Sequence, residues 1–179
     1  MGELKNAPKA KLFVAMLVAP DGMDRLEPFD RGLAEHFGPI DLTSQTWPFD
    51  FTEYYTPEMG PGLTRRIVSF ERTIDPAYLV QAKRTTNELE EQFTREIRGP
   101  GAGRAVNFDA GYLTLGQLVL ATTKSYSHRI YLDHGIWAEV TLRYFKGRYE
   151  KWEWTYPDYA DGRYNDFWLA MREKLKENP

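Results

Sequence analysis

The chain has 179 residues, of which 42% are hydrophobic and 15% aromatic, and its formal net charge is −3 at pH 7. These values predict one folded globular domain, exclude a disordered chain and argue against a main role in non-specific nucleic-acid binding. The absence of cysteine excludes disulfides and thiolate zinc sites, and the absence of an apolar run of membrane-spanning length excludes a transmembrane segment.

The first part of the chain, residues 10–109, has the pattern of a ferredoxin-like β-α-β-β-α-β arrangement. A short apolar strand comes first and ends at a Pro-Asp-Gly turn. Apolar residues then recur at helical spacing up to Gly38, where a glycine C-cap is typical. Asp75 and Pro76 mark the start of a second, longer helix. The predicted strands cover 11–19, 40–46, 64–74 and 104–108, and the predicted helices cover 26–37 and 76–97.

The second part, residues 110–179, is predicted to extend the same sheet with an antiparallel meander. A short helix over 114–123, capped by Thr114, precedes three runs that alternate with period two. These runs cover 128–132, 136–145 and 148–155, and Gly135 and Gly147 lie in the hairpin signals between them. A final helix covers 164–175. We therefore expect an α+β fold in a single domain, with the helices on one side of the sheet.

Alternation along 136–145 assigns each side chain of the meander to one of two faces. The expected hairpin register places Arg129 opposite Glu139. It also places Tyr131 opposite Trp137. Cations interleaved with aromatic rings are typical of a sheet that stacks bases and holds phosphates. The expected polar face comprises Ser127, Arg129, Tyr131, Trp137, Glu139, Thr141 and Arg143, and the apolar face comprises Ile136, Ala138, Val140 and Leu142.

The segment 107–131 is the most informative part of the chain, because it brings a carboxylate, an ammonium, an imidazole and a guanidinium into one short stretch. It lies in a basic region, since residues 104–148 hold 6 Lys/Arg against 3 Asp/Glu, and that balance suits an anionic ligand. Strand 64–74 carries further charges that extend the site. The candidate ligand-binding residues are Lys124, Arg129, Tyr131, Trp137, Arg143, Arg65, Arg66 and Glu71, and the candidate catalytic residues are His128, Glu139 and Asp109.

Three functions fit these residues. The first is the binding of a phosphorylated small molecule, in particular a nucleotide, with RNA as the larger alternative ligand. The second is an enzyme of nucleotide or RNA metabolism in which His128 is the general acid or base, oriented by Glu139 or Asp109. The third is a non-catalytic interaction or scaffold protein. We expect a cytoplasmic protein that does not bind membranes; no particular cofactor or oligomeric state is indicated, and the histidines lack metal-ligand spacing.

Each candidate also has a purely structural interpretation. Cross-strand pairs such as Arg143–Glu150 are a common device of hairpins, and Asp109 fits turn chemistry. The charges on strand 64–74 fit an edge strand protected from aggregation. Alternation also places His128 on the opposite face from Arg129 and Glu139, so these residues converge only if the strand bulges. This favours an anion-binding face over a histidine-centred catalytic site.

Distinctive stretches occur along the chain, beginning at Phe49, Glu58, Ser69, Thr86, Gly111, Ala121, His128, Ala138 and Trp154. They resemble the hallmark stretches of a prokaryotic family, the domain of unknown function 4416. The resemblance covers nearly the whole chain and implies no established activity. Some members carry the automatic label GTP-binding protein, yet this sequence has neither a Gly-Lys-Ser/Thr loop nor an Asn-Lys-x-Asp motif. The recurring polar stretches coincide with the candidate segment, which supports Lys124, His128, Arg129 and Glu139.

Overall fold

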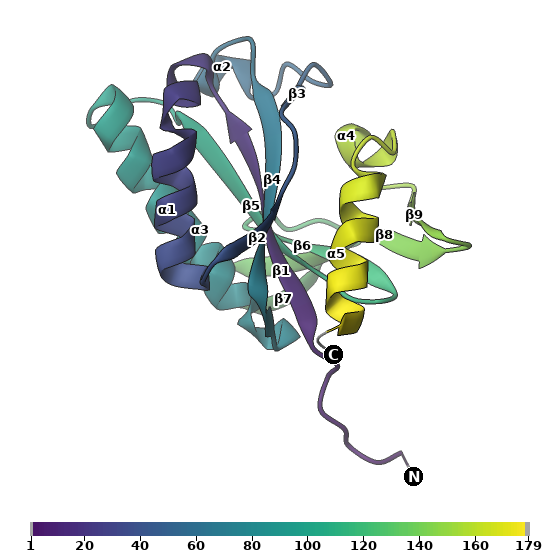
Figure 1. Cartoon of the computed structure of the whole chain (residues 1–179). Helices are drawn as coiled ribbons and strands as arrows, with labels where there is room; N and C mark the ends of the chain where they lie inside the picture. Colours follow the sequence, from purple (N-terminus) through teal and green to yellow (C-terminus); the bar gives the residue numbers. More distant parts are fainter. Residues whose placement is uncertain (1, 178–179) are drawn as a thin grey trace.

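The computed structural model describes residues 2–177 and contains one nine-stranded antiparallel sheet (Figure 1). The strand order is β2-β4-β1-β5-β6-β8-β7, while β3 pairs with β4 and β9 pairs with β8. The strands are β1 (Ala10–Val18), β2 (Ile40–Thr43), β3 (Trp47–Pro48), β4 (Thr64–Ile74), β5 (Val106–Leu113), β6 (Gln117–Thr122), β7 (Ile130–Asp133), β8 (Ile136–Phe145) and β9 (Arg148–Lys151).

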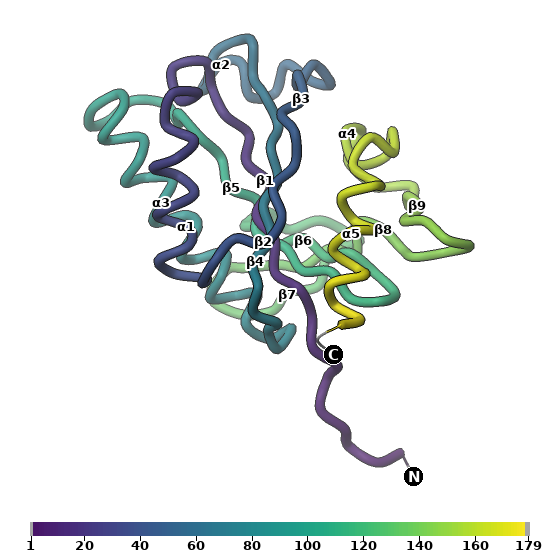
Figure 2. Tube along the Cα trace, in the orientation of Figure 1, coloured from purple at the N-terminus to yellow at the C-terminus, as the bar shows by residue number. Residues whose placement is uncertain are grey.

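Helices cover both faces of this sheet. Figures 1 and 2 show α1 and α3 on one side of β1 and α5 on the other, so the expectation that all helices lie on one side is wrong. The physical reason lies in β1, whose nine residues are all buried and must be covered on both faces. The helices are η1 (Pro20–Arg25), α1 (Leu26–Phe37), α2 (Thr56–Met59), η2 (Pro76–Tyr78), α3 (Leu79–Arg98), α4 (Pro157–Ala160) and α5 (Asn165–Glu177).

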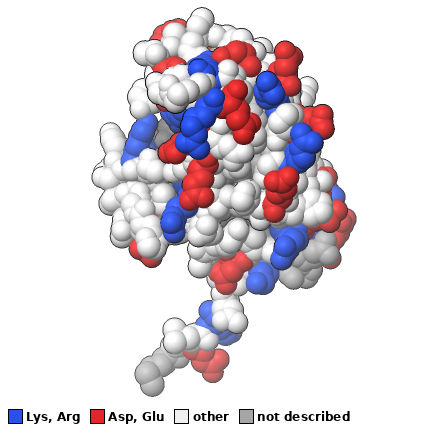
Figure 3. Space-filling model, turned by 90° about the vertical axis from the view of Figure 1, so that its left-hand side faces the viewer, with Lys and Arg blue, Asp and Glu red and all other residues white. Residues whose placement is uncertain are grey.

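The two faces of β1 carry two separate cores. Leu12, Val14 and Met16 pack with residues of α1 and α3, whereas Phe13 and Ala15 pack with residues of α5. On the surface formed by α1 and α3, acidic and basic side chains are interspersed (Figure 3), as the small net charge suggests. Within the described part of the chain, no helix combines the length and the apolar character that crossing a membrane requires.

The helix ends follow the local signals in the sequence. Gly38 has a φ of 89°, and its N–H donates to the carbonyl of Ala34 at the end of α1. Asp75 accepts a hydrogen bond from the N–H of Ala77 at 2.9 Å, as expected of a cap. The predicted bounds of α1 and of β4 are confirmed. The strand predicted at 104–108 corresponds to β5, which covers Val106–Leu113. Asp109 therefore lies within a strand and not in a turn.

The predicted short helix over 114–123 is wrong, because residues 117–122 form β6. The misleading signal is Thr114, whose hydroxyl accepts hydrogen bonds from the N–H groups of Gly116 and Gln117 at 3.2 and 3.1 Å. A helix N-cap makes similar bonds, but here they close the turn between β5 and β6. Leu118, Val119, Leu120 and Ala121 are all buried, so β6 shows no alternation.

The predicted faces of β8 are interrupted by a bulge at Thr141. Leu118 pairs with Leu142 and Val119 pairs with Val140, which leaves Thr141 as an extra residue in β8. Leu142 therefore packs in the core beneath α5, while Val140 packs in another cluster with Val119. The expectation that Ile136, Ala138, Val140 and Leu142 share one face is thus wrong at Leu142.

Candidate functional site

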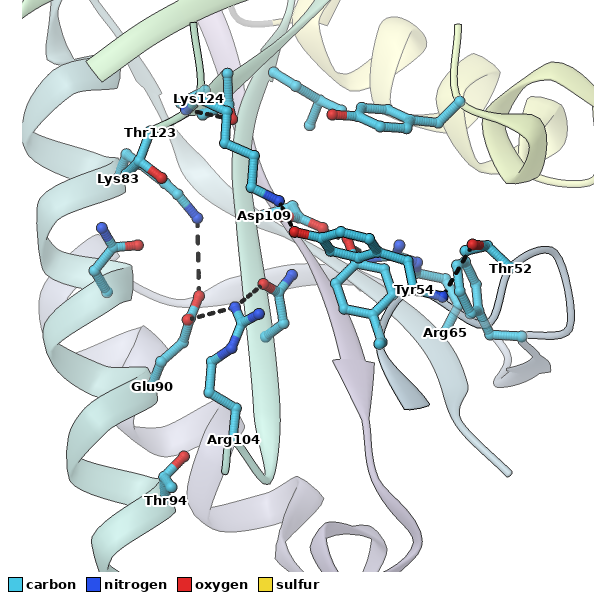
Figure 4. A pocket seen from close by; sticks show the side chains of 18 of the residues that line it. Thr52, Tyr54, Arg65, Lys83, Glu90, Thr94, Arg104, Asp109, Thr123 and Lys124 are labelled. Atoms are coloured by element: carbon cyan, nitrogen blue, oxygen red, sulfur yellow. Dashed lines mark hydrogen bonds and ion pairs between the residues drawn. The ribbon is translucent and has the colours of Figure 1, made fainter. Parts of the chain in front are cut away.

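A cleft of about 1130 Å³ opens where β6 separates from β5. The two strands pair only from Gly111–Leu120 to Leu113–Leu118. Residues 106–110, earlier in β5, pair with β1 but with no other described strand. At the junction β5 approaches closely, since a Cβ on Gly111 would lie 2.6 Å from the carbonyl oxygen of Val119. The cleft is lined by α3, β5, the end of β6, residues 49–55 and α4, together with Arg65 of β4 and Glu139 of β8 (Figure 4).

Two charged side chains of α3 bind the open edge of β5. Lys83 donates to the carbonyl of Phe108 at 2.7 Å, and the N–H of Phe108 donates to Glu90 at 2.7 Å. Lys83 and Glu90 also lie 3.8 Å apart (Figure 4). Burial raises the pKa of Glu90, an effect that Lys83 partly offsets. These two residues were not predicted; the available signal was two charges on α3, seven residues apart, beside its apolar stripe.

Arg104 continues this charged wall. Its guanidinium donates to Glu58 at 2.7 and 2.8 Å and to Asn107 at 2.5 Å, and it lies 3.4 Å from Glu90. Through Glu58 it ties the segment that follows the aromatic stretch to β5. Arg104 was likewise missed from the sequence, where a lone arginine after a glycine-rich loop gives no particular signal.

Arg65, Asp109 and Asp158 form a buried cluster on the opposite wall. Arg65 is 3% exposed and contacts Asp109 at 3.1 Å and Asp158 at 3.2 Å. Its guanidinium also lies over the rings of Phe49 and Tyr159, at 5.2 and 6.0 Å from their centres. The cluster therefore joins β4, β5 and α4 at one place, and its members come from three distant parts of the sequence.

The two carboxyl groups of this cluster differ in their pKa. Burial opposes the ionisation of Asp109, but Arg65 and Lys83 outweigh it and hold the pKa of Asp109 below its usual value. Burial dominates at Asp158, so its pKa is raised even though Arg65 is adjacent. One ionised and one more easily protonated carboxyl group thus bracket a single guanidinium.

Several buried polar atoms of the cleft lack a hydrogen-bond partner. Arg65 Nε and the Tyr159 hydroxyl have no partner among residues 2–177, although both side chains are nearly inaccessible to solvent. Asn107 Nδ2 lies on the same face of β5 as Asp109 and helps to lower its pKa, but it forms no hydrogen bond of regular geometry within residues 2–177. Buried polar groups in proteins are rarely left unpaired, so these atoms indicate a place for a ligand or ordered water.

Lys124 and Tyr54 face each other across the mouth of the cleft. Lys124 Nζ lies 2.5 Å from the Tyr54 hydroxyl and 4.3 Å from the centre of its ring (Figure 4). Both side chains are exposed, and the hydrogen bond from Lys124 lowers the pKa of Tyr54. Further aromatic side chains of the same segment, Phe49, Phe51 and Tyr55, line the cleft behind Tyr54.

Glu139 connects the cleft to His128 and Arg129. It is 2% exposed, lines the cleft, and one of its oxygens lies 3.0 Å from His128 Nε2 and 2.9 Å from Arg129 Nε. The expected separation of His128 from these residues is wrong, because β7 begins only at Ile130 and His128 lies in the preceding turn. A turn is not bound by strand alternation, so both side chains reach the same carboxylate.

Arg129 is held by the protein on all sides. Besides Glu139, its guanidinium donates to the carbonyl of Lys124 at 2.9 Å and to the hydroxyl of Tyr156 at 2.6 Å. His128 stacks on Trp154, with ring centres 5.2 Å apart and an angle of 12°. These contacts fix the loop that carries Lys124, and they place Arg129 and His128 behind Glu139, outside the lining of the cleft.

The structure thus brings together only part of the predicted site. The expected pairs Tyr131–Trp137 and Arg143–Glu150 are present in the sheet, but they do not line the cleft. β4 is an interior strand between β2 and β1, so the edge-strand interpretation of its charges is wrong. Of the predicted residues, Arg65, Asp109, Lys124 and Glu139 line the cleft, whereas His128, Arg129, Tyr131, Trp137, Arg143, Arg66 and Glu71 do not.

Arg66 and Glu71 lie apart from the cleft for different reasons. Arg66 follows Arg65 along β4, so it points to the other face, where it forms two hydrogen bonds with Asp30 of α1 at 2.6 and 2.7 Å. Glu71 is exposed near the end of β4. Among residues 2–177, no three His, Asp or Glu side chains are grouped so that they could hold a metal ion.

The charge of the cleft is mixed and balanced, and most of its charged groups pair with one another. Lys124 is the exception, because its ammonium contacts only the phenol of Tyr54 within the described structure. The cationic residues of the lining are Arg65, Lys83, Arg95, Arg104 and Lys124, and the acidic ones are Glu90, Glu91, Asp109, Glu139 and Asp158.

These features define an α+β protein with a nine-stranded antiparallel sheet and five α-helices in its described part. A cleft lined by charged and aromatic side chains lies where the sheet divides. The chain belongs to the family named Domain of unknown function (DUF4416), whose model matches residues 8–175. Comparisons with curated proteins and with solved structures gave no significant match.

Proposed function

We propose that the protein binds a phosphorylated small molecule, in particular a nucleotide, and that the ligand occupies the cleft between α3 and the 49–55 segment. One observation carries this proposal: aromatic side chains and the uncommitted ammonium of Lys124 face a cleft that contains unpartnered buried donors. Its volume of about 1130 Å³ is enough for a nucleotide, since small-molecule sites span roughly 300–1,000 Å³.

The proposal keeps the ligand class expected from the sequence but changes the surface that binds it. Tyr131 and Trp137 pack edge to face with ring centres 5.2 Å apart, which leaves no gap for a base between them. Phe49, Phe51 and Tyr54 line the cleft and supply the aromatic surface instead, and Tyr54 contacts Lys124. RNA is the less suitable ligand, because a recessed cleft admits one nucleotide more readily than a strand.

The test is a thermal-shift and calorimetric screen of ribonucleoside mono-, di- and triphosphates, with a short RNA oligonucleotide in the same series. We expect at least one nucleotide to raise the unfolding temperature, and Lys124→Ala to abolish or strongly reduce that shift. Lys9→Ala is the matched control, because it removes the same charge from the exposed N-terminal segment. If no phosphorylated compound raises the unfolding temperature, the proposed function is wrong.

A catalytic role for His128 is the second candidate, and the contact between His128 and Glu139 at 3.0 Å favours it. The carboxylate fixes the orientation of the imidazole, as a general acid or base requires, and Glu139 itself reaches the cleft. If ligands bind but His128→Ala leaves every product profile unchanged, the catalytic candidate fails. A buried Arg129–Glu139 pair with no adjacent cavity would favour the scaffold interpretation. Glu139 lines the cleft, so this arrangement does not favour a scaffold.

We also infer a ferredoxin-like arrangement for the first half and a single domain for the whole chain. The antiparallel order β5-β1-β4-β2, with α1 and α3 on one face, supports the former. The continuous sheet through both halves supports the latter, and one cooperative unfolding transition in denaturant is the expected result. Two separate transitions would contradict the single domain. The cytoplasmic location stays a prediction.

A further inference from the structure

The inner end and the mouth of the cleft differ in charge and in burial. At the inner end Arg65 and Asp158 are 3% and 4% exposed, and Asp109 completes the cluster. One guanidinium between two carboxyl groups carries a net charge of −1, or zero when Asp158 is protonated. In neither state does the inner end attract a phosphate, which would lie against two carboxyl groups that already share one cation.

The inner end is nevertheless rich in hydrogen-bonding groups. Arg65 Nε and the hydroxyl of Tyr159 have no partner in the described chain, and carboxyl oxygens of Asp109 and Asp158 lie in the same wall. Such a mixture of donors and acceptors matches an uncharged group that both donates and accepts, such as a nucleobase or a ribose. The rings of Phe49 and Tyr159 flank Arg65 and suit a flat, partly apolar ligand.

The wall formed by α3 and Arg104 also contains cations, but the protein itself engages them. Lys83 donates to the carbonyl of Phe108 and pairs with Glu90. Arg104 binds Glu58 and Asn107 and reaches Glu90 as well. A chain of phosphates along this wall would have to displace these contacts, including those that complete the open edge of β5.

At the mouth the situation is reversed. Lys124 is exposed, and the only contact of its ammonium within residues 2–177 is with Tyr54, which is itself 62% exposed. The ammonium can therefore exchange a neutral phenol for an anion without leaving a buried group unpaired. Arg95, the other cation on this side, already lies 3.7 Å from Glu91. One uncommitted cation suits one phosphate group.

We infer that the cleft selects a nucleoside monophosphate and binds it in one orientation, with the nucleoside at the Arg65–Asp109–Asp158 end and the phosphate at Lys124. This inference rests on the proposed function, which requires only that some phosphorylated ligand binds. It adds the number of phosphates, the direction of the ligand and the separate role of each end of the cleft.

Calorimetric titration with the four ribonucleosides, their 5′-monophosphates, their 5′-triphosphates and inorganic pyrophosphate tests the inference. We expect one monophosphate to bind more tightly than its nucleoside by roughly tenfold or more, as one charge-assisted hydrogen bond allows, and more tightly than its triphosphate. Pyrophosphate is expected to bind more weakly than any of them, because it offers nothing to the inner end.

Two single-residue variants separate the ends of the cleft. Lys124→Ala should reduce the affinity for the monophosphate to about that of the nucleoside and leave nucleoside binding within about twofold. Tyr159→Phe removes one oxygen at the inner end and should weaken both ligands by the same factor. Circular dichroism and the unfolding temperature establish that each variant is folded, and Lys9→Ala again controls for charge.

The outcomes distinguish the two proposals. A triphosphate or pyrophosphate that binds more tightly than the monophosphate overturns the inferred orientation and phosphate number, while it supports phosphate binding by the protein. Equal loss of nucleoside and monophosphate affinity in Lys124→Ala also overturns the orientation. Absence of binding by every compound overturns the proposed function together with the inference.

Discussion

Two buried clusters of charge lie on the same face of β4 and differ in how completely their polar atoms are paired. Ser69, with Lys11 and Asp41, forms the first cluster. Arg65, with Asp109 and Asp158, forms the second. Ser69 and Arg65 are four residues apart along the strand, which corresponds to roughly 13 Å. Both clusters contain a buried cation with at least one carboxyl group, and Asp41 of the first also lies 3.7 Å from the half-exposed Lys174.

The first cluster is closed. Lys11 donates to the carbonyl of Phe70 and lies 2.7 Å from Asp41, which accepts a further hydrogen bond from Ser69 at 2.7 Å. The second cluster adjoins a cleft and leaves Arg65 Nε without a partner in the described chain. Buried charge alone therefore does not identify a binding site. The informative feature is a buried polar atom that the protein does not pair.

The largest expected effect comes from breaking the closed cluster. Asp41→Ala leaves the ammonium of Lys11 buried without its carboxylate, and we expect a loss of about 3–5 kcal/mol in the free energy of unfolding. Asp158→Ala should cost less, because Arg65 keeps Asp109 as a partner and the cleft admits water. Denaturant unfolding of both variants measures the difference. An equal loss in both would contradict the distinction between closed and open clusters.

The pH dependence of stability should have opposite signs at Asp41 in the first cluster and at Asp158 in the second. Burial raises the pKa of Asp41, but Lys11 and Ser69 outweigh this effect and hold that pKa below 3.8. The stabilisation from Asp41 is therefore present above about pH 4 and is lost as the pH falls. Burial raises the pKa of Asp158, so the folded state binds that proton more tightly, and stability is lost as the pH rises through the raised pKa.

Unfolding measurements on Asp41→Asn and Asp158→Asn between about pH 3 and pH 7 test these signs. Relative to wild type, Asp41→Asn should become less stable as the pH rises from the acidic end towards 4, whereas Asp158→Asn should become more stable as the pH rises. Parallel curves for the two variants would rule out the difference between Asp41 and Asp158.

Removal of a single hydroxyl gives a smaller and more direct comparison. Ser69→Ala deletes a hydroxyl that donates to Asp41, so we expect a loss of about 0.5–1.5 kcal/mol and no change in ligand binding. Tyr159→Phe deletes an unpartnered hydroxyl, so stability should be unchanged or should rise by about 1 kcal/mol. A clear loss of stability in Tyr159→Phe would show that this hydroxyl is paired in the free protein.

The smallest effect is expected at the partly exposed hairpin pair Arg143–Glu150, whose charged atoms lie 3.6 Å apart. A double-mutant cycle with Arg143→Ala and Glu150→Ala should give a coupling energy of about 0.2–1 kcal/mol, reduced by salt. Ligand binding should be unaffected, since neither residue lines the cleft. A change in nucleotide affinity in either variant would return the binding surface to the β8–β9 hairpin.

Strands delimited by turn signals were predictable from the sequence, including β1, which is buried on both faces, but β6 was not. The bounds of β4 and β8 match the prediction, because turn signals delimit both runs. In β6 the uniform burial of Leu118 to Ala121 removes the alternation that marks a strand, and Thr114 imitates a helix cap. The bulge at Thr141 has no local signal, because it arises from the pairing of two strands.

The candidate site, like the fold, was only partly predictable from the sequence. Lys124, Asp109 and Glu139 were identified because they lie in or next to one dense polar segment. Lys83, Glu90 and Arg104 were missed because only the separation of β6 from β5 exposes them to the cleft. No period or spacing in a single chain records where two neighbouring strands part, so a site of this kind is only partly visible in the sequence.

The hydrogen bonds of α3 to Phe108 have a consequence for solubility. An unpaired strand edge invites another chain to add to the sheet, which leads to aggregation. Here Lys83 offers a donor and Glu90 an acceptor at the positions where a neighbouring backbone would bind. The two side chains imitate the missing strand, so the sheet can divide around a cleft without presenting this part of its edge to a second molecule.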